Sequence, residues 1–443
     1  MNFDQRGPSP ALKTSLSDAE VERIVAPLRA ANQAFMARYP GERADRQPVH
    51  TVYGGAHLFR ADTARKLGDL ALRALREHAE DAGALAQAFG LPRDLAETLH
   101  PRVEQKLGRE PVEDLRIDFE DGYGSRPDAE EDGHVVACAQ EAARGHAEAT
   151  LPAFWGIRIK PMTEELRARA LRTLDGFLST LLKATGGLLP PGFVLTLPKL
   201  QLPEHGAALS DALDALEPKL GLAAGTLRFE IMIEQTQAVV DAKGHVALPA
   251  LVAATRGRCV AAHLGTYDYT ASCGITAAHQ QMTHPACDFA KACMQASLGG
   301  TGIWLSDGAT NVMPVGERAA VHAAWRLQAS HVRHSLVGGF YQGWDLHPSQ
   351  LVARYAAVYA FFLEALPAAT ARLGNFVERA AQATLVGDVF DDAATGQGLL
   401  NFFLRGLACG AISEAEALAT GLTLDELRSR SFVKILAERR ALQ

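Results

Sequence analysis

The stretch DLRIDFEDGYG, residues 114–124, joins a short apolar run to three carboxylates within four positions, Asp118, Glu120 and Asp121. Apolar residues alternate with polar ones in its first half, which is typical of a strand. Carboxylates repel one another, so their crowding requires a cation or a positive side chain nearby. The stretch therefore predicts a strand that ends in a charged site.

Similar runs recur along the chain, and most are separated by enough residues for a helix. Together with the stretch at 114–124, these runs predict strands at 49–54, 115–120, 155–160, 193–199, 228–234, 260–265, 302–306 and 339–346. Repeated βα units imply a parallel sheet. Eight of them predict a closed (β/α)₈ TIM barrel, whose active site lies at the C-terminal ends of the strands. An open doubly wound sheet is the alternative, but no GxGxxG motif follows the first strand.

Both ends of the chain have helical patterns. Ser17 and Glu20 form a capping box ahead of apolar residues at helical spacing, which predicts a helix that covers the body without a chemical role. The region after residue 350 is rich in alanine and contains two more capping boxes. We therefore expect an N-terminal helical segment at 1–48, a catalytic barrel at 49–355 and a C-terminal helical domain at 356–443.

Composition excludes several classes of protein. The chain has 443 residues, of which 48% are hydrophobic and 21% charged, and its net charge of −7 without a basic run argues against a nucleic-acid surface. Its six cysteines form no CxxC pair, so neither a zinc site nor a disulfide framework is indicated, and free thiols suit a reducing cytoplasm. We see no signal peptide and no apolar run of the roughly 20 residues that a membrane span needs.

Polar residues follow most of the predicted strands. Carboxylates follow the second, fifth, sixth, seventh and eighth, and cations belong to the third and fourth; these residues are Glu120, Asp121, Arg158, Lys199, Glu234, Asp268, Asp307 and Asp345. Such a ring of carboxylates suits Mg²⁺, which binds one or two carboxylates and keeps waters or substrate oxygens. Asp121, Asp268 and Asp307 could each instead be helix N-caps. Glu234 and Arg158 interrupt apolar strands, where an unpaired charge would be costly.

Six of these segments, in order, resemble the superfamily of malate synthases and citrate lyase β-subunits, which are Mg²⁺-dependent barrels. DFEDG (118–122) is similar to the family's DFEDS, IRIKP (157–161) to VRINP, and LPKL (197–200) to LPKME. IMIEQT (231–236) is similar to VLIET, LGTYDY (264–269) to LGxxDL, and WDLHPSQ (344–350) to WAIHPSQ. The DDAAT segment at 391–395 resembles a seventh family segment, EDAAT.

The resemblance implies a set of roles. Glu234 and Asp268 would bind Mg²⁺, with Mn²⁺ as an alternative, and Arg158 would stabilise an oxyanion. Glu120, Asp121, Lys199, Gly265 and Thr266 would bind substrate, with Glu120 and Asp121 holding metal-bound waters or orienting Arg158. Asp392 would be the catalytic base, delivered by the C-terminal domain of its own chain or of a neighbouring subunit. The resemblance also implies the type of enzyme: a carbon–carbon lyase or Claisen-type synthase that acts on a small 2-oxo acid through a metal-stabilised enolate.

Several residues depart from the family pattern and leave the substrate open. Lys160 replaces the asparagine of VRINP, and Gln235 stands where the family has threonine. His57, in a loop where the lyases tend to have VPGN, is either an added acid–base group or a polar loop residue.

The sequence does not decide whether a coenzyme A thioester is a co-substrate. The alternatives are a phosphoenolpyruvate- or pyruvate-binding phosphotransferase and a non-catalytic metabolite-binding relative. We expect a cytoplasmic homo-oligomer without nucleic-acid or membrane partners.

Overall fold

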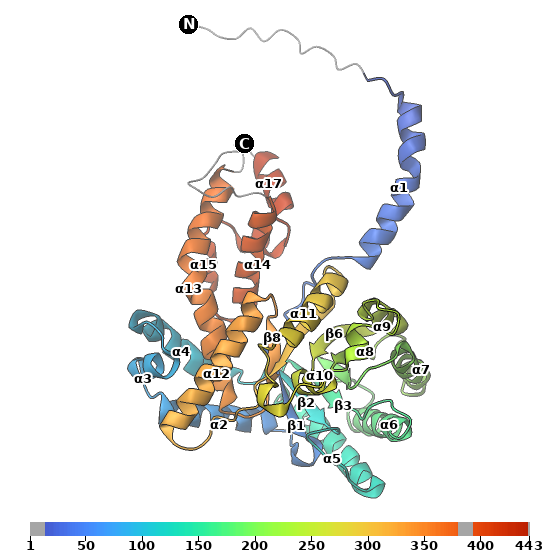
Figure 1. Ribbon diagram of the computed structural model, residues 1–443, viewed down its shortest axis with the longest axis vertical. Helices are drawn as coiled ribbons and strands as arrows, with labels where there is room; N and C mark the ends of the chain where they lie inside the picture. The colour runs from blue at the N-terminus through green and yellow to red at the C-terminus, as the bar shows by residue number, and fades with distance from the viewer. Residues whose placement is uncertain (1–13, 380–392, 442–443) are drawn as a thin grey trace.

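The protein is a closed barrel of eight parallel strands surrounded by helices (Figure 1). The computed structural model describes residues 14–379 and 393–441. The strands follow one another in chain order, and the last pairs with the first: β1 His50–Gly55, β2 Asp114–Asp118, β3 Phe154–Arg158, β4 Phe193–Leu197, β5 Phe229–Ile233, β6 Cys259–Leu264, β7 Trp304–Ala309 and β8 Gln342–Asp345. Each predicted strand is present, with ends displaced by a few residues, so the predicted (β/α)₈ fold class is confirmed.

The strand register brings site candidates to one level of the barrel. Gly55 of β1 pairs with Asp118 of β2, which pairs with Arg158 of β3, and Arg158 pairs with Thr196 of β4. Neighbouring strands in a sheet lie about 4.8 Å apart, so side chains at paired positions can meet directly. The fold therefore places the acid of the DFEDG segment next to the arginine of the IRIKP segment.

Helices fill the connections between the strands and cover the outside of the barrel. Their apolar faces pack on the strands, and one continuous core of buried residues joins them to the barrel wall. The helical segments up to β8 are η1 Ala56–Leu58, α2 Thr63–His78, α3 Ala82–Phe89, α4 Arg93–Arg109, α5 Asp128–Ala147, α6 Arg167–Ala184, α7 Pro203–Lys219, α8 Thr236–Val239, α9 Leu248–Ala254, α10 Thr266–Ser272, η2 Ala277–His279, α11 Pro285–Leu298 and α12 Arg318–Val337.

An ion-pair network fills the barrel interior below the C-terminal ends of the strands. Arg116 donates from Nε and Nη2 to both carboxylate oxygens of Glu230 at 2.9 Å, and it also contacts Asp114. Glu230 in turn bonds to His263 Nε2 at 2.9 Å. A buried charge is tolerated only where partners of this kind satisfy it. The network therefore fills the barrel interior below the C-terminal ends of the strands.

The C-terminal helices form a lobe beside the barrel (Figure 1). They are α13 Gln350–Arg379, α14 Ala393–Cys409, α15 Glu414–Leu418, α16 Leu424–Arg428 and α17 Phe432–Ala441. The capping boxes predicted ahead of α15 and α16 are both present. In the described part of the chain, α13 alone is long and apolar enough to span a membrane, but 67% of that window is buried within the protein. α13 runs through the predicted domain boundary at 355 without a break.

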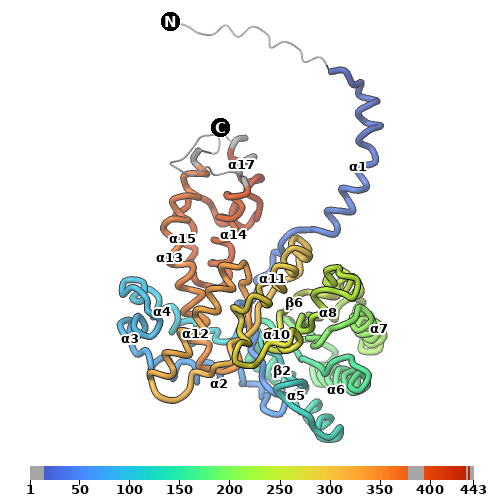
Figure 2. The backbone as a smooth tube through the Cα atoms, in the orientation of Figure 1, coloured from blue at the N-terminus to red at the C-terminus, as the bar shows by residue number. Residues whose placement is uncertain are grey.

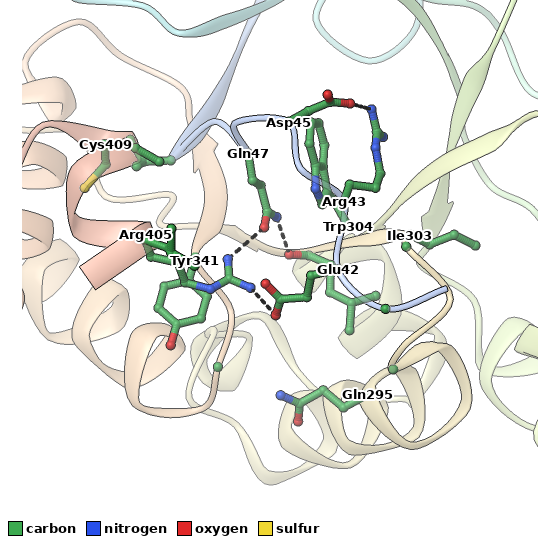
Figure 3. A pocket seen from close by; sticks show the side chains of 18 of the residues that line it. Glu42, Arg43, Asp45, Gln47, Gln295, Ile303, Trp304, Tyr341, Arg405 and Cys409 are labelled. Carbon is green, nitrogen blue, oxygen red and sulfur yellow. Dashed lines mark hydrogen bonds and ion pairs between the residues drawn. The ribbon is translucent and has the colours of Figure 1, made fainter. Parts of the chain in front are cut away.

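Arg405 of α14 binds to residues at the N-terminal face of the barrel, where the strands begin. Its guanidinium donates to Glu42 at 2.8 Å and to Gln47 at 3.2 Å, and it lies 3.9 Å above the ring of Tyr341 (Figure 3). Glu42 and Gln47 precede β1, and Tyr341 immediately precedes β8. This end of α14 therefore lies at the face of the barrel opposite the C-terminal ends of the strands.

The N-terminal helix α1, Asp18–Arg38, begins with the predicted capping box of Ser17 and Glu20. Figure 1 and the backbone trace in Figure 2 show it projecting from the rest of the molecule. No residue of α1 is buried. The prediction of a covering helix is therefore wrong for this chain by itself, because periodicity identifies an apolar face but not the surface against which that face packs.

Candidate active site

Lys199 joins four of the predicted acids at the C-terminal ends of the strands. Its ammonium contacts Glu120 and lies 3.1 and 3.2 Å from the two carboxylate oxygens of Asp121. It is also 3.8 Å from Asp268, and its backbone N–H donates to Glu234 Oε1 at 2.5 Å. Loops that follow β2, β4, β5 and β6 therefore converge on one acid cluster at the barrel mouth.

The backbone of Lys199 is left-handed, with φ of 49°. A non-glycine residue in this region is uncommon and costs of order 1–3 kcal/mol, and such residues concentrate at functional sites. The turn after β4 directs both the backbone N–H and the ammonium of Lys199 toward carboxylates of the mouth. This position therefore supports the prediction that Lys199 belongs to a functional site.

Arg158, at the end of β3, is held by Asp118 through two parallel hydrogen bonds. Nε donates to Oδ1 at 2.7 Å and Nη2 to Oδ2 at 2.6 Å, while Nη1 lies 3.1 Å from Glu120. Burial opposes the charge of Arg158, but Asp118 and Glu120 raise its pKa well above the usual value. The guanidinium is therefore permanently charged and fixed in orientation, with Nη1 on the side of the acid cluster.

The DFEDG turn wraps around the Asp118 carboxylate. Oδ1 accepts the backbone N–H of Glu120 at 2.9 Å, and Oδ2 accepts that of Gly122 at 2.7 Å. A β-carbon at position 122 would lie 2.6 Å from Oδ2, so glycine is required for this approach. The family resemblance implied that Glu120 and Asp121 hold metal-bound waters or orient Arg158. In the structure, Asp118 makes the two-point contact with Arg158, and Asp121 pairs with Lys199.

Glu234 is buried directly after β5, and Gly265 leaves room for its carboxylate. A β-carbon at position 265 would lie 2.5 Å from both Cβ and Oε2 of Glu234. Burial, with smaller contributions from nearby Asp268 and Glu120, raises the pKa of Glu234 to about 8, although Lys199 and Arg158 oppose this shift. Glu234 therefore lies where additional positive charge would stabilise the ionised carboxylate.

The charges at the mouth fit a divalent cation. Five carboxylates face two cationic side chains; the acids are Asp118, Glu120, Asp121, Glu234 and Asp268, and the cations are Arg158 and Lys199. In the described residues, no group of three or more histidine, cysteine, aspartate or glutamate side chains is arranged to hold a metal. Mg²⁺ needs only one or two carboxylates, because waters or substrate oxygens supply its other ligands. The donor set around Glu234 and Asp268 is therefore suitable for Mg²⁺.

Three buried polar atoms around the mouth have no hydrogen-bond partner: Tyr53 Oη, Glu120 Oε2 and Thr266 Oγ1. The ring of Tyr53 lies 4.7 Å from the Arg158 guanidinium, and Thr266 begins α10 next to Gly265. Glu120 Oε2 is close to Arg158 without hydrogen-bond geometry. Buried polar atoms are nearly always satisfied in proteins, so these three are candidates for a hydrogen bond to a bound water or ligand. Tyr53 was not among the predicted site residues.

His57, in η1, packs against aromatic side chains at and after the DFEDG turn. Its ring packs 5.8 Å from the ring of Tyr123 and 6.4 Å from that of His134, and its Nδ1 is buried without a partner. Burial, Arg126 and His134 lower its pKa. Its role as an acid–base group therefore stays a prediction. Asp392, the predicted base, lies outside the described residues.

Three other polar residues point away from the mouth. Asp307 lies within β7 and bonds to Lys291 at 3.0 Å, and Asp345 ends β8 and pairs with Arg354. Lys160 donates to Phe119 O at 2.8 Å and pairs with a glutamate of α5. These charges therefore tie strands and loops to the surrounding helices. The ring of carboxylates is correspondingly smaller than the sequence suggested.

Solved structures with the same kind of fold are only distantly similar. A Haloferax volcanii malate synthase in a magnesium/glyoxylate complex is 12% identical, with 86% of this chain and 99% of that chain covered and a TM-score of 0.44. The same enzyme in a pyruvate/acetyl-CoA ternary complex is 14% identical, with 90% and 100% covered and a TM-score of 0.43. An HpcH/HpaI aldolase from Desulfitobacterium hafniense DCB-2 is 11% identical, with 78% and 96% covered and a TM-score of 0.37.

No curated protein matches the chain. One family matches residues 28–435, which include the barrel and nearly all of the C-terminal helices. This chain therefore belongs to the family described as a domain of unknown function, DUF6986.

Proposed function

We propose that this protein is a Mg²⁺-dependent carbon–carbon lyase or Claisen-type synthase that acts on a small 2-oxo acid. The observation that carries the proposal is the arrangement of Arg158, whose guanidinium is fixed by Asp118 next to an acid cluster with excess negative charge. A permanently charged donor next to a cation site suits the binding of an anion whose carbonyl oxygen gains charge in the reaction. The six segments that resemble the malate synthase and citrate lyase superfamily support the same reaction class.

Each residue of the cluster has a role in this proposal. Bound through Glu234 and Asp268, Mg²⁺ would polarise the carbonyl of the 2-oxo acid as a Lewis acid. Arg158 would donate from Nη1 to the oxygen on which negative charge develops, since Nε and Nη2 both donate to Asp118. Lys199 would keep Glu120 and Asp121 in place, and Thr266 Oγ1 would donate to a substrate carboxylate.

The base in this proposal is Asp392, as the family resemblance implies. The first turns of α14, which directly follow Asp392, are also tied to the N-terminal side of the barrel, because Gln397 donates to Arg430 O at 3.1 Å and the Arg430 side chain donates to the backbone of residues 43 and 44 ahead of β1. Of the two arrangements that the sequence left open, this placement favours a neighbouring subunit as the source of Asp392. The active site would then be complete only in an oligomer.

A metabolite screen tests the proposal. Purified protein is incubated with glyoxylate or pyruvate, with and without acetyl-coenzyme A, and with free 2-hydroxy acids in the cleavage direction. We expect Mg²⁺-dependent turnover in one of these assays. Arg158→Lys should lower it by about 10²–10³ because lysine cannot reproduce the fixed fork. Arg167→Lys, a change at an exposed arginine of α6, is the matched control and should leave turnover unchanged.

A fully active Arg158→Lys protein would exclude the oxyanion role. Absence of turnover with every substrate, together with unchanged thermal unfolding on addition of Mg²⁺ and glyoxylate or pyruvate, would exclude the proposed function as a whole.

A further inference from the structure

Helix α1 has an apolar face that the described part of its own chain does not cover. Six large apolar residues of the helix are between 38% and 63% exposed, and they recur at helical spacing: Val21, Ile24, Val25, Leu28, Phe35 and Met36. A single helix of 21 residues has marginal stability in water unless its apolar face packs on something. The helix therefore requires a partner surface.

The joint at the base of α1 directs the helix away from the body. The backbone N–H of Gly41 donates to Gly300 O at 2.8 Å, and Tyr39, the C-cap, bonds back to Phe35 O at 2.9 Å. The side chain of Tyr39 also lies beside Gly300. Because these contacts fix the exit of the chain, the helix stands apart from the barrel in Figures 1 and 2. We infer that α1 packs antiparallel against α1 of a second copy of this chain.

The sequence of α1 is complementary to itself in this orientation. Leu28 is the midpoint of Asp18–Arg38, so in an antiparallel pair it faces its own symmetry mate. At the same register, Val21 faces Phe35 and Val25 faces Ala31, while Ile24 faces Asn32 and Met36 faces Glu20. A two-fold interface requires the same patch on both copies, and this stripe meets that requirement.

The charges of the helix favour the same orientation. The first turn of α1 contains Asp18 and Glu20, and the last turn contains Arg38. Antiparallel pairing places the acidic end of each helix beside the basic end of the other, whereas parallel pairing places like charges together. It also brings opposite ends of the two helix dipoles together, which is favourable.

A groove at the base of α1 extends the proposed surface. A cavity of about 490 Å³ is lined by Arg38, Pro40, Arg43 and Arg228 together with apolar residues that include Val252 and Ile303. The whole chain has a net charge of −7, so a groove lined by three arginines differs in charge from the chain as a whole. The acidic first turn of the partner helix would enter this groove, with Leu16, which is 51% exposed, ahead of it.

Disulfide cross-linking tests the orientation. In a background in which exposed Cys273 is replaced by serine, Leu28→Cys should cross-link to a covalent dimer on mild oxidation. Val21→Cys alone should not, whereas an equal mixture of Val21→Cys and Phe35→Cys chains should. Leu58→Cys, at a 69% exposed leucine of η1, is the control and should stay monomeric on a denaturing gel. Cross-linking of Val21→Cys with itself, but not of Leu28→Cys, would overturn the antiparallel inference.

The oligomeric state tests the interface. The wild-type chain should sediment as a dimer or a multiple of a dimer, and Leu28→Glu should halve the mass. Leu58→Glu, the control, should have the same mass as the wild-type chain. Because α1 buries none of its residues within the chain, Leu28→Glu leaves the folding of the body intact, and its circular dichroism verifies this. A monomeric wild-type chain, as expected if α1 folded back on its own body, would overturn the inference, as would an unchanged mass of Leu28→Glu.

Discussion

Arg158 Nε lies 2.7 Å from Asp118 Oδ1 while its Nη2 lies 2.6 Å from Asp118 Oδ2, in the last layer of the barrel below the acid cluster. Both residues are almost fully buried, at 5% and 1% exposure. The contact engages two donors of the guanidinium and leaves Nη1 on the side of the cluster. Asp118 therefore determines the direction of Nη1, which lies between Glu120 and Met232.

We predict that Asp118→Asn lowers turnover because it removes the charge that orients Arg158. An amide can accept only one of the two hydrogen bonds, so the guanidinium would be held loosely and left without its full counter-charge. Removing one partner of a buried pair also destabilises a protein by about 3–5 kcal/mol. Steady-state kinetics and urea unfolding measure both effects. Asp132→Asn, which weakens the pairing of α5 with Arg169 and Arg172 of α6 on the outside of the barrel, is the control and should leave kcat unchanged. Normal kcat in Asp118→Asn would refute the orienting role.

We predict that Gly265→Ala displaces Glu234, because the new β-carbon would lie 2.5 Å from the Glu234 carboxylate. Buried Glu234 cannot withdraw without moving β5, so the affinity for Mg²⁺ should fall at least tenfold, measured by calorimetry. Gly133→Ala is the matched control, because a β-carbon there meets nothing within 4 Å. It lies in α5, where alanine should instead stabilise the protein by up to about 1 kcal/mol. Equal Mg²⁺ affinities in the two variants would show that Gly265 does not shape a metal site.

We predict that Asp392→Asn retains binding of Mg²⁺ and 2-oxo acid but loses turnover, because an amide cannot take the proton. Mixing Asp392→Asn chains with Arg158→Lys chains under subunit exchange should restore part of the activity if the base comes from a neighbour. Asp425→Asn, at an exposed position of α16, is the control. Normal turnover in Asp392→Asn would transfer the role of base to His57, the other acid–base candidate.

We predict that the bond between Arg102 and Glu416 stabilises the docking of the C-terminal helices in a pH-dependent way. Arg102 of α4 donates to Glu416 at 2.6 and 3.1 Å, and its hydrogen bond lowers the pKa of Glu416 from 4.5 to about 2. A lowered carboxyl pKa contributes stability above pH 4.5, and this contribution is lost as the pH falls through about 2.

Arg102→Leu should therefore destabilise the protein at pH 7 by about 1–2 kcal/mol in urea unfolding, and the difference from wild type should shrink between pH 4.5 and 2. Arg93→Leu, which removes a 75% exposed arginine of the same helix, is the control and should cost less than about 1 kcal/mol. A difference that stayed constant down to pH 2 would show that Arg102 acts through packing and not through the Glu416 charge.

The barrel could be predicted from the sequence because each strand is a short apolar run, and repeated strand–helix units close in few ways. Arg158 and Glu234 could be selected because a charge inside an apolar strand needs a partner. The direction of a side chain at a strand end could not be predicted, because consecutive residues point to opposite sides of the barrel wall. Asp307 and Asp345 therefore pair with Lys291 and Arg354 outside the mouth.

Contacts between distant segments were also inaccessible to sequence patterns. The left-handed turn at Lys199 and the two-point contact of Asp118 depend on which loops meet, and no periodicity encodes that. In the same way, the pattern of α1 identified its apolar face but not that the described residues leave this face uncovered. The placement of α14 at the N-terminal face depends on Arg405, an arginine in an otherwise ordinary amphipathic helix.

The most direct test of the account is the dependence of carbon–carbon bond cleavage or formation on Mg²⁺ in protein first stripped with EDTA. Turnover of a 2-oxo or 2-hydroxy acid substrate is measured as Mg²⁺ is added back to wild type, to Glu234→Gln and to Glu204→Gln, which alters an exposed glutamate of α7. The account predicts that Mg²⁺ restores turnover in wild type and Glu204→Gln but not in Glu234→Gln. Full turnover by stripped wild type without added metal, or equal recovery of Glu234→Gln, would contradict it.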